Sequence, residues 1–214
     1  MKTRFILVRH GQSEGNAQRM ILGHADRDIT DVGRAQAECV SRALSDRKID
    51  AVYSSDLLRA YNTVLPAAAS RGLSVIPDVD LREINMGLWE GRSVDEIIRE
   101  YGELFTVEWM RHFGSFRAPK GESTAELACR IKGALERIAG ENPGCTVLIG
   151  THAAAIRAFW GLVTGIPAEQ IDEALPFPDN ASYSEIDYVG GVFTPVSYSV
   201  SHYLSAAMVT QLPF

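Results

Sequence analysis

The chain has 214 residues, of which 46% are hydrophobic and 22% are charged, so its length and composition indicate one globular domain. The formal net charge of −6 argues against a protein that binds the nucleic-acid backbone, because such proteins need a basic face. The three cysteines are odd in number and far apart, which predicts no disulfide framework or zinc site and fits a reducing cytoplasm. The apolar run after Arg4 is too short for a signal peptide, and no run has the length of a membrane span.

The first predicted element is a short core strand, residues 5–8, which ends in a pair of basic side chains. A continuous apolar run bounded by a turn signal is typical of a strand covered on both faces. It brings Arg9 and His10 to its carboxyl end, where open α/β sheets hold ligands. We expect Gly11 to let the chain turn and a ligand approach the backbone. An arginine beside a histidine suits an anion, although the same pair also occurs at solvated strand ends.

Residues 9–16, with the sequence RHGQSEGN, resemble the signature of the histidine phosphatase superfamily, in its phosphoglycerate mutase-like branch. Asn16 stands where that family has an asparagine, seven residues after the arginine, and the resemblance implies that it contacts substrate. The resemblance extends over nearly the whole chain. It implies an α/β fold with one three-layer α/β/α domain over residues 1–214 and a mostly parallel central sheet.

A polar loop comes next and ends at Thr30 or Asp31, either of which is a good N-cap for the helical pattern that follows. The family has a similar passage, in which Gly23 matches a glycine, and the resemblance places Gly23 among the substrate-binding residues. Leu22 departs from the family pattern, because many members have glutamine there. We expect His24 to be a surface loop residue.

A second strand is predicted over residues 50–54, with a helix beginning at Ser55 and Asp56. Arg59 then lies near the helix start, where free backbone N–H groups favour anions. Residues 54–63 resemble a family segment whose arginine holds the phosphate. Arg59 by itself could be a solvated helix residue, but a second arginine after a strand end favours a functional role.

Residues 81–91 match a family segment of the form L-x-E-x-x-x-G-x-W-E-G, and the resemblance makes Glu83 the proton donor. Apolar surroundings disfavour a charged carboxylate, so Glu83 is expected to stay protonated long enough to act as an acid. The alternative is a structural pair with Arg82. Trp89 is expected in the core or the pocket wall.

Residues 93–116 carry a helical pattern that matches no recognisable motif, and we expect them to form a helical lid insertion over the pocket. Ser123 and Glu126 predict a capping box at the start of a helix over residues 124–139.

A third core strand, residues 145–150, brings Thr151 and His152 to the same sheet edge, and a helix over residues 153–162 follows. The family has a glycine after this histidine. Ala153 replaces it here, and its N–H remains available to a phosphate oxygen. A lone histidine after a strand is often structural, but a second such histidine favours function. A pair of strands at residues 183–187 and 192–200 ends the predicted fold.

The resemblance implies a metal-independent phosphatase that hydrolyses small phosphomonoesters. His10 would form a phosphohistidine, Glu83 would protonate the leaving oxygen, and three residues would offset the phosphoryl charge: Arg9, Arg59 and His152. The sequence has no carboxylate cluster or P-loop, so no metal or cofactor is expected. The expected partner is a small phosphorylated metabolite, and neither nucleic acid nor a membrane is expected. The sequence leaves open whether the chain forms a homodimer.

Two alternatives use the same residues. A cofactor-dependent phosphoglycerate mutase would return the phosphoryl group to substrate, and a non-catalytic phospho-ligand binder would have lost His10 or Glu83, which are both present. The short span between Glu83 and His152 favours the phosphatase, because a smaller lid leaves the phosphohistidine open to water. Leu22 also favours it, since it removes a polar group that could hold a small hydroxy acid.

Overall fold

The central sheet of the protein, seen in a computed structural model that describes residues 1–109 and 111–209, has six strands. These are β1 (Thr3–Arg9), β3 (Ala51–Ser54), β4 (Val75–Pro77), β6 (Thr146–Thr151), β7 (Tyr183–Val189) and β8 (Val192–Val200). Their order across the sheet is β4-β3-β6-β1-β7-β8, in which the first four are parallel to one another. β7 is antiparallel to β1, and β8 is antiparallel to β7. The predicted mostly parallel sheet is therefore confirmed.

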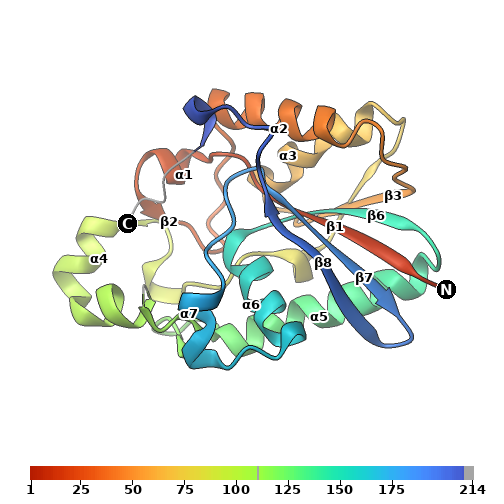
Figure 1. Ribbon diagram of the computed structural model, residues 1–214. Coiled ribbons are helices and arrows are strands. Elements are labelled where there is room, and N and C mark those ends of the chain that lie inside the picture. The colour runs from red at the N-terminus through yellow and green to blue at the C-terminus, as the bar shows by residue number, and fades with distance from the viewer. Residues whose placement is uncertain (110, 210–214) are drawn as a thin grey trace.

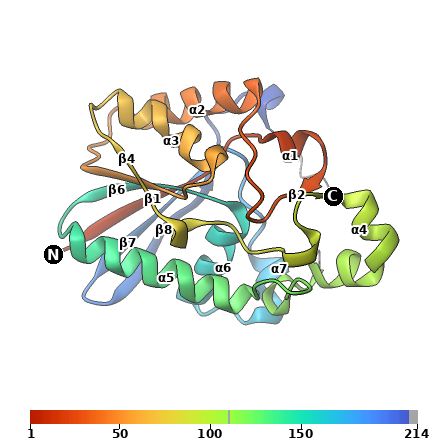
Figure 2. The ribbon, with the colours of Figure 1, turned by 180° about the vertical axis from the view of Figure 1, so that it is seen from behind.

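Helices cover both faces of this sheet, as Figure 1 shows. α2 (Asp31–Ala43) and α3 (Leu58–Ala69) lie on one face, and α5 (Thr124–Glu141) and α6 (Ala153–Thr164) lie on the other (Figure 2). The remaining elements are short: α1 (Glu14–Ala17), β2 (Met20–Ile21), β5 (Arg92–Ser93), α4 (Val94–Tyr101) and α7 (Ile171–Ala174), with 3-10 turns at Val79–Leu81, Gly87–Trp89, Phe113–Ser115, Ala168–Gln170 and Ala206–Met208. β2 and β5 form a separate antiparallel pair. The three-layer α/β/α architecture is as predicted.

The apolar run of β1 is continuous because each face of the strand packs in a different core. Phe5 and Leu7 belong to the hydrophobic cluster that includes α5 and α6 residues, whereas Ile6 and Val8 belong to the cluster that includes α2 and α3 residues. All four side chains are almost completely buried. Burial on both faces fixes the register of β1, because a slip by one residue would move Arg9 into one of the cores.

Two predicted helix starts are confirmed by their caps. Thr30 accepts a hydrogen bond from the Gly33 N–H at the start of α2, and Ser123 forms a capping box with Glu126 at the start of α5. The predicted start at Ser55 is wrong, because α3 begins at Leu58. The Ser55 N–H instead donates to the Gly150 carbonyl of β6, so the chain is still tied to the sheet at that residue.

The predicted helical segment of residues 93–116 is broken into several pieces. It holds α4, a π-helical turn over Leu104–Trp109 and the 3-10 turn at Phe113–Ser115, and residue 110 is not among the described residues. Gly102, with φ of +48°, ends α4. Within residues 1–109 and 111–209, no helix has the length and apolar character needed to cross a membrane.

Candidate active site

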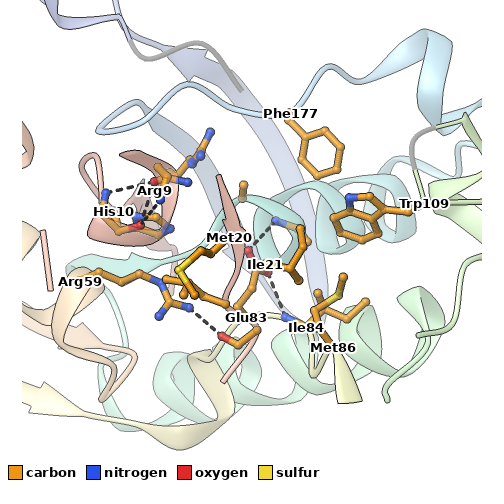
Figure 3. Close-up of a pocket in the computed structure, with 16 residues that line it drawn as sticks. Arg9, His10, Met20, Ile21, Arg59, Glu83, Ile84, Met86, Trp109 and Phe177 are labelled. Atoms are coloured by element: carbon orange, nitrogen blue, oxygen red, sulfur yellow. Dashed lines mark hydrogen bonds between the residues drawn. The ribbon is translucent and has the colours of Figure 1, made fainter. Parts of the chain in front are cut away.

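The carboxyl ends of two parallel strands carry three of the predicted catalytic side chains to one edge of the sheet. Arg9 ends β1 and His10 follows it, whereas His152 follows β6. Seven of the eight predicted site residues line one pocket: Arg9, His10, Asn16, Gly23, Arg59, Glu83 and Ala153 (Figure 3). The eighth, His152, does not line the pocket, but its ring centroid lies 5.3 Å from that of His10. The structure thus brings together all the side chains that the sequence selected.

The imidazole of His10 is held in one tautomer. Its Nδ1 lies 2.7 Å from the carbonyl oxygen of Gly11, and because a carbonyl can only accept, Nδ1 carries the proton. Nε2 therefore has the lone pair. Burial, with the charges of Arg59 and Arg9, holds the pKa of His10 well below its usual value of 6.5. The ring is neutral at pH 7 and is a competent nucleophile.

His152 presents an unsatisfied ring nitrogen behind the first imidazole. Its Nε2 lies 2.9 Å from the Ser55 hydroxyl, which can donate or accept there and also accepts the Leu57 N–H at 3.3 Å. Within the described chain Nδ1 of His152 is buried without a hydrogen-bond partner, as is Nε of Arg9. A bound anion would satisfy the Arg9 N–H, and also the His152 Nδ1–H in the tautomer whose Nε2 accepts from Ser55. Burial also lowers the pKa of His152 well below 6.5.

Two buried guanidinium groups supply the positive charge of the pocket. Arg59, in the first turn of α3, donates to the carbonyl oxygens of Gly23 at 2.7 Å and Ala25 at 3.0 Å. Arg9 donates to the carbonyl of Pro178. Burial lowers the pKa of each arginine to about 10, so both remain charged near neutral pH. Their desolvated charges act on a bound phosphoryl group far more strongly than exposed cations would.

From the sequence we expected apolar surroundings for Glu83, but its carboxyl group has polar partners. Its carboxylate oxygens accept the N–H groups of Ala154 at 3.2 Å, Ala155 at 3.1 Å and Ile84 at 3.0 Å. The first two donors belong to the first turn of α6, whose dipole also favours a negative charge. These three donors give the carboxyl group polar partners, so apolar surroundings do not explain an acid role. What the geometry provides is a fixed position beside the two arginines.

Sequence reasoning missed the residues that hold this glutamate in place. Arg130 of α5 donates to the carbonyl oxygens of three residues in the segment that carries it: Asp80 at 2.9 Å, Arg82 at 3.0 Å and Glu83 at 3.1 Å. Arg130 is itself paired with Glu122 at 2.7 Å. His24, expected at the surface, is half-buried and donates from Nε2 to the Glu83 carbonyl at 2.8 Å.

Asn16 and Gly11 have structural partners that the sequence did not indicate. The Asn16 side-chain oxygen accepts from the N–H of Ser13 at 3.1 Å and from Asn180 Nδ2 at 3.2 Å, so its contact with substrate stays a prediction. A Cβ at Gly11 would lie 2.7 Å from the carbonyl oxygen of Gly33 in α2. Close packing against α2 therefore requires glycine at that position, and the approach of a ligand to its backbone stays a prediction.

The outer part of the pocket is apolar. The pocket has a volume of about 90 Å³, which is room for several waters or one phosphoryl group in its inner part. Besides the charged and small or polar residues, seven large apolar side chains line it: Met20, Ile21, Leu22, Ile84, Met86, Trp109 and Phe177. Trp89, by contrast, is completely buried in the core and is not a wall residue.

The acidic, histidine and cysteine side chains do not gather into a metal-ion site. Among the described residues, no group of three or more of these side chains could hold a metal ion. The positive charge that offsets a bound anion would come from Arg9 and Arg59.

Comparison with known proteins agrees with the site. A sequence model of the histidine phosphatase superfamily (branch 1) matches residues 5–201. Phosphoserine phosphatase 1 of Hydrogenobacter thermophilus is 34% identical over 184 residues, which are 86% of this chain and 85% of that protein. A protein of Photorhabdus laumondii named "Probable phosphoglycerate mutase GpmB" is 35% identical over 182 residues, which are 85% of this chain and 83% of its own.

Solved structures share the fold over nearly their full length. Bacillus stearothermophilus YhfR superposes with a TM-score of 0.88 at 28% identity, covering 94% of this chain and 100% of that one. Mycobacterial glucosyl-3-phosphoglycerate phosphatase Rv2419c superposes with a TM-score of 0.84 at 25% identity, covering 92% of this chain and 99% of that one.

Proposed function

This chain belongs to the histidine phosphatase superfamily (branch 1), and on that premise we propose that it hydrolyses small phosphomonoesters through a phosphohistidine on His10. Its family and its phosphatase relatives make it a phosphoric monoester hydrolase. The observation that carries the proposed mechanism is the state of His10, a neutral ring whose Nδ1 is fixed by Gly11 and whose Nε2 keeps its lone pair at the pocket.

In the first step, His10 Nε2 attacks the phosphorus and the bond between phosphorus and the leaving oxygen breaks. Arg9 and Arg59 offset the charge on the equatorial oxygens, and the orphaned Nδ1–H of His152 donates to one of them. In the second step a water attacks the phosphorus, the bond to His10 breaks, and phosphate leaves.

Glu83 gives its proton to the leaving oxygen and later takes one from the attacking water. Three N–H donors hold the carboxyl group in one position for both transfers.

A phosphoglycerate mutase is the second candidate, since one relative carries that name. The charges of the pocket support hydrolysis instead. Of the described residues that line it, the charged ones are Arg9, Arg59 and Glu83, and both arginines lie on the side of the pocket that holds His10 (Figure 3). A carboxylate or a second phosphate on the substrate would find no further cation among them. With 3-phosphoglycerate and added 2,3-bisphosphoglycerate, phosphate release should exceed isomerisation, and the reverse would favour the mutase.

The direct test traps the covalent intermediate. The enzyme is mixed with a phosphomonoester labelled in its phosphoryl group and quenched within one turnover. We expect an adduct that is labile in acid and stable in base, as a phosphoramidate is, and that is absent in His10→Ala. His202→Ala is the matched control, because His202 is exposed and should keep both adduct and turnover. Full turnover by His10→Ala would falsify the mechanism.

A further inference from the structure

Another polar group of the pocket, the indole N–H of Trp109, has no hydrogen-bond partner among the described residues and no role in the steps above. Trp109, in the π-helical turn, is only 5% exposed and lines the pocket. Its indole Nε1 is buried without a hydrogen-bond partner in the described part of the chain. A buried donor left unpaired costs about 1–3 kcal/mol, which an acceptor on a molecule bound in the pocket would recover.

The surroundings of this indole are aromatic and aliphatic. Its ring centroid lies 5.8 Å from that of Phe177 and 4.9 Å from that of Phe116. Figure 3 shows Trp109 and Phe177 on the side of the pocket away from His10 and Arg59, with Ile21 between. The part of a substrate that contacts Trp109 is therefore surrounded by apolar side chains rather than by the two arginines.

The apolar wall is held firmly rather than by a loose loop. The carbonyl of Pro176 accepts a hydrogen bond from the Tyr198 hydroxyl at 2.7 Å, and the carbonyl of Pro178 accepts one from Arg9. Phe177 lies between these two anchors, and its ring packs 4.2 Å from the guanidinium carbon of Arg157. Arg9 thus fixes the wall and binds the phosphoryl group with the same side chain.

We propose that Trp109 is a specificity-determining hydrogen-bond donor for the alcohol part of the substrate. The substrate class is a phosphomonoester whose alcohol part is a mainly apolar ring or chain with one neutral acceptor, such as a ring nitrogen or an ether or carbonyl oxygen. This inference rests on the proposed phosphatase function. It excludes a preference for small charged alcohols, because the cations that line the pocket in the described chain are both at the phosphoryl end.

The test compares substrates of one shape. Benzyl phosphate and the three pyridylmethyl phosphates differ only in a ring nitrogen, which can accept from Trp109. We measure kcat/KM for all four with the native enzyme and with Trp109→Phe, which keeps an aromatic ring and removes the N–H. The native enzyme should favour at least one pyridyl isomer about tenfold over benzyl phosphate, and Trp109→Phe should lose that preference.

Trp89→Phe is the matched control. Trp89 is also buried with an unpartnered indole N–H, but it does not line the pocket. Trp89→Phe should therefore keep the pyridyl preference. Equal ratios in the native enzyme and Trp109→Phe for all three isomers would overturn the proposal, as would an equal loss in Trp89→Phe.

A second variant covers the case in which Trp109→Phe does not fold. Phe177→Leu should lower kcat/KM more for benzyl phosphate than for methyl phosphate, and equal losses count against the apolar subsite. If the native enzyme hydrolyses nitrophenyl phosphate but not benzyl phosphate, the proposed apolar subsite is wrong and the phosphatase function stands. Failure on every phosphomonoester would overturn the phosphatase function as well.

Discussion

Replacing Arg130 by methionine should both destabilise the protein and misplace Glu83, the proposed proton donor. The side chain of Arg130 is 20% exposed and that of its partner Glu122 is 15% exposed, so water replaces their interactions poorly. The substitution removes the ion pair and the Arg130 hydrogen bonds to three carbonyl oxygens, of which that of Glu83 keeps only its bond from His24.

The expected loss of stability follows from those contacts. Breaking a fully buried ion pair costs about 3–5 kcal/mol, and partial exposure reduces this, so we expect about 3 kcal/mol for Arg130→Met. The matched control is Arg117→Met on the same side of the molecule, where the pair of Arg117 with Glu126 has side chains 53% and 55% exposed. That variant should lose about 1 kcal/mol or less. Urea unfolding at neutral pH measures both.

The effect on catalysis separates positioning from mere stability. Arg130→Met should reduce kcat about tenfold for alkyl phosphates, whose leaving oxygen needs the proton of Glu83, and less for nitrophenyl phosphate. Arg117→Met should leave both rates near those of the native enzyme. If Arg130→Met loses no more stability than its control, or slows both substrates equally, the reasoning about this network is wrong.

Three other changes have clear expected outcomes. Glu83→Gln should lower kcat by about 10²-fold for alkyl phosphates and less for nitrophenyl phosphate, and equal losses in steady-state assays would leave Glu83 only a positioning role. Burial lowers the pKa values of His10 and His152 below 6.5, so below that pH the unfolded chain binds more protons than the folded one. The free energy of unfolding should therefore fall as the pH drops below 6.5. Urea unfolding at about pH 7.5 and pH 5 should show this fall, and it should be smaller in His10→Gln. A Cβ at Gly33 would lie 2.3 Å from the Gln12 carbonyl oxygen, so Gly33→Ala should cost several kcal/mol in thermal unfolding, and a native Tm would contradict the close packing of α2.

The order of strands and helices could be predicted because it depends on local patterns. Two-sided burial makes β1 a continuous apolar run, and the caps at Thr30 and Ser123 act within their own first turns. The start of α3 could not be predicted from its own residues. Its Leu58 N–H donates to the carboxylate of Asp26 at 2.9 Å, a cap supplied by a loop far away in the sequence.

By itself the sequence determined which side chains gather at the strand ends, because the carboxyl ends of parallel strands share one edge of the sheet. Arg9, His10 and His152 could be placed there from the strands that precede them. Only the tertiary structure decided their chemical state. The neutrality of His10 depends on burial and on Arg59, and the position of the Glu83 carboxyl group depends on N–H groups of α6, which are 71 and 72 residues away along the chain. A pKa and a hydrogen bond are set by what lies within a few ångströms, and for these residues that is decided by parts of the chain that no local pattern connects.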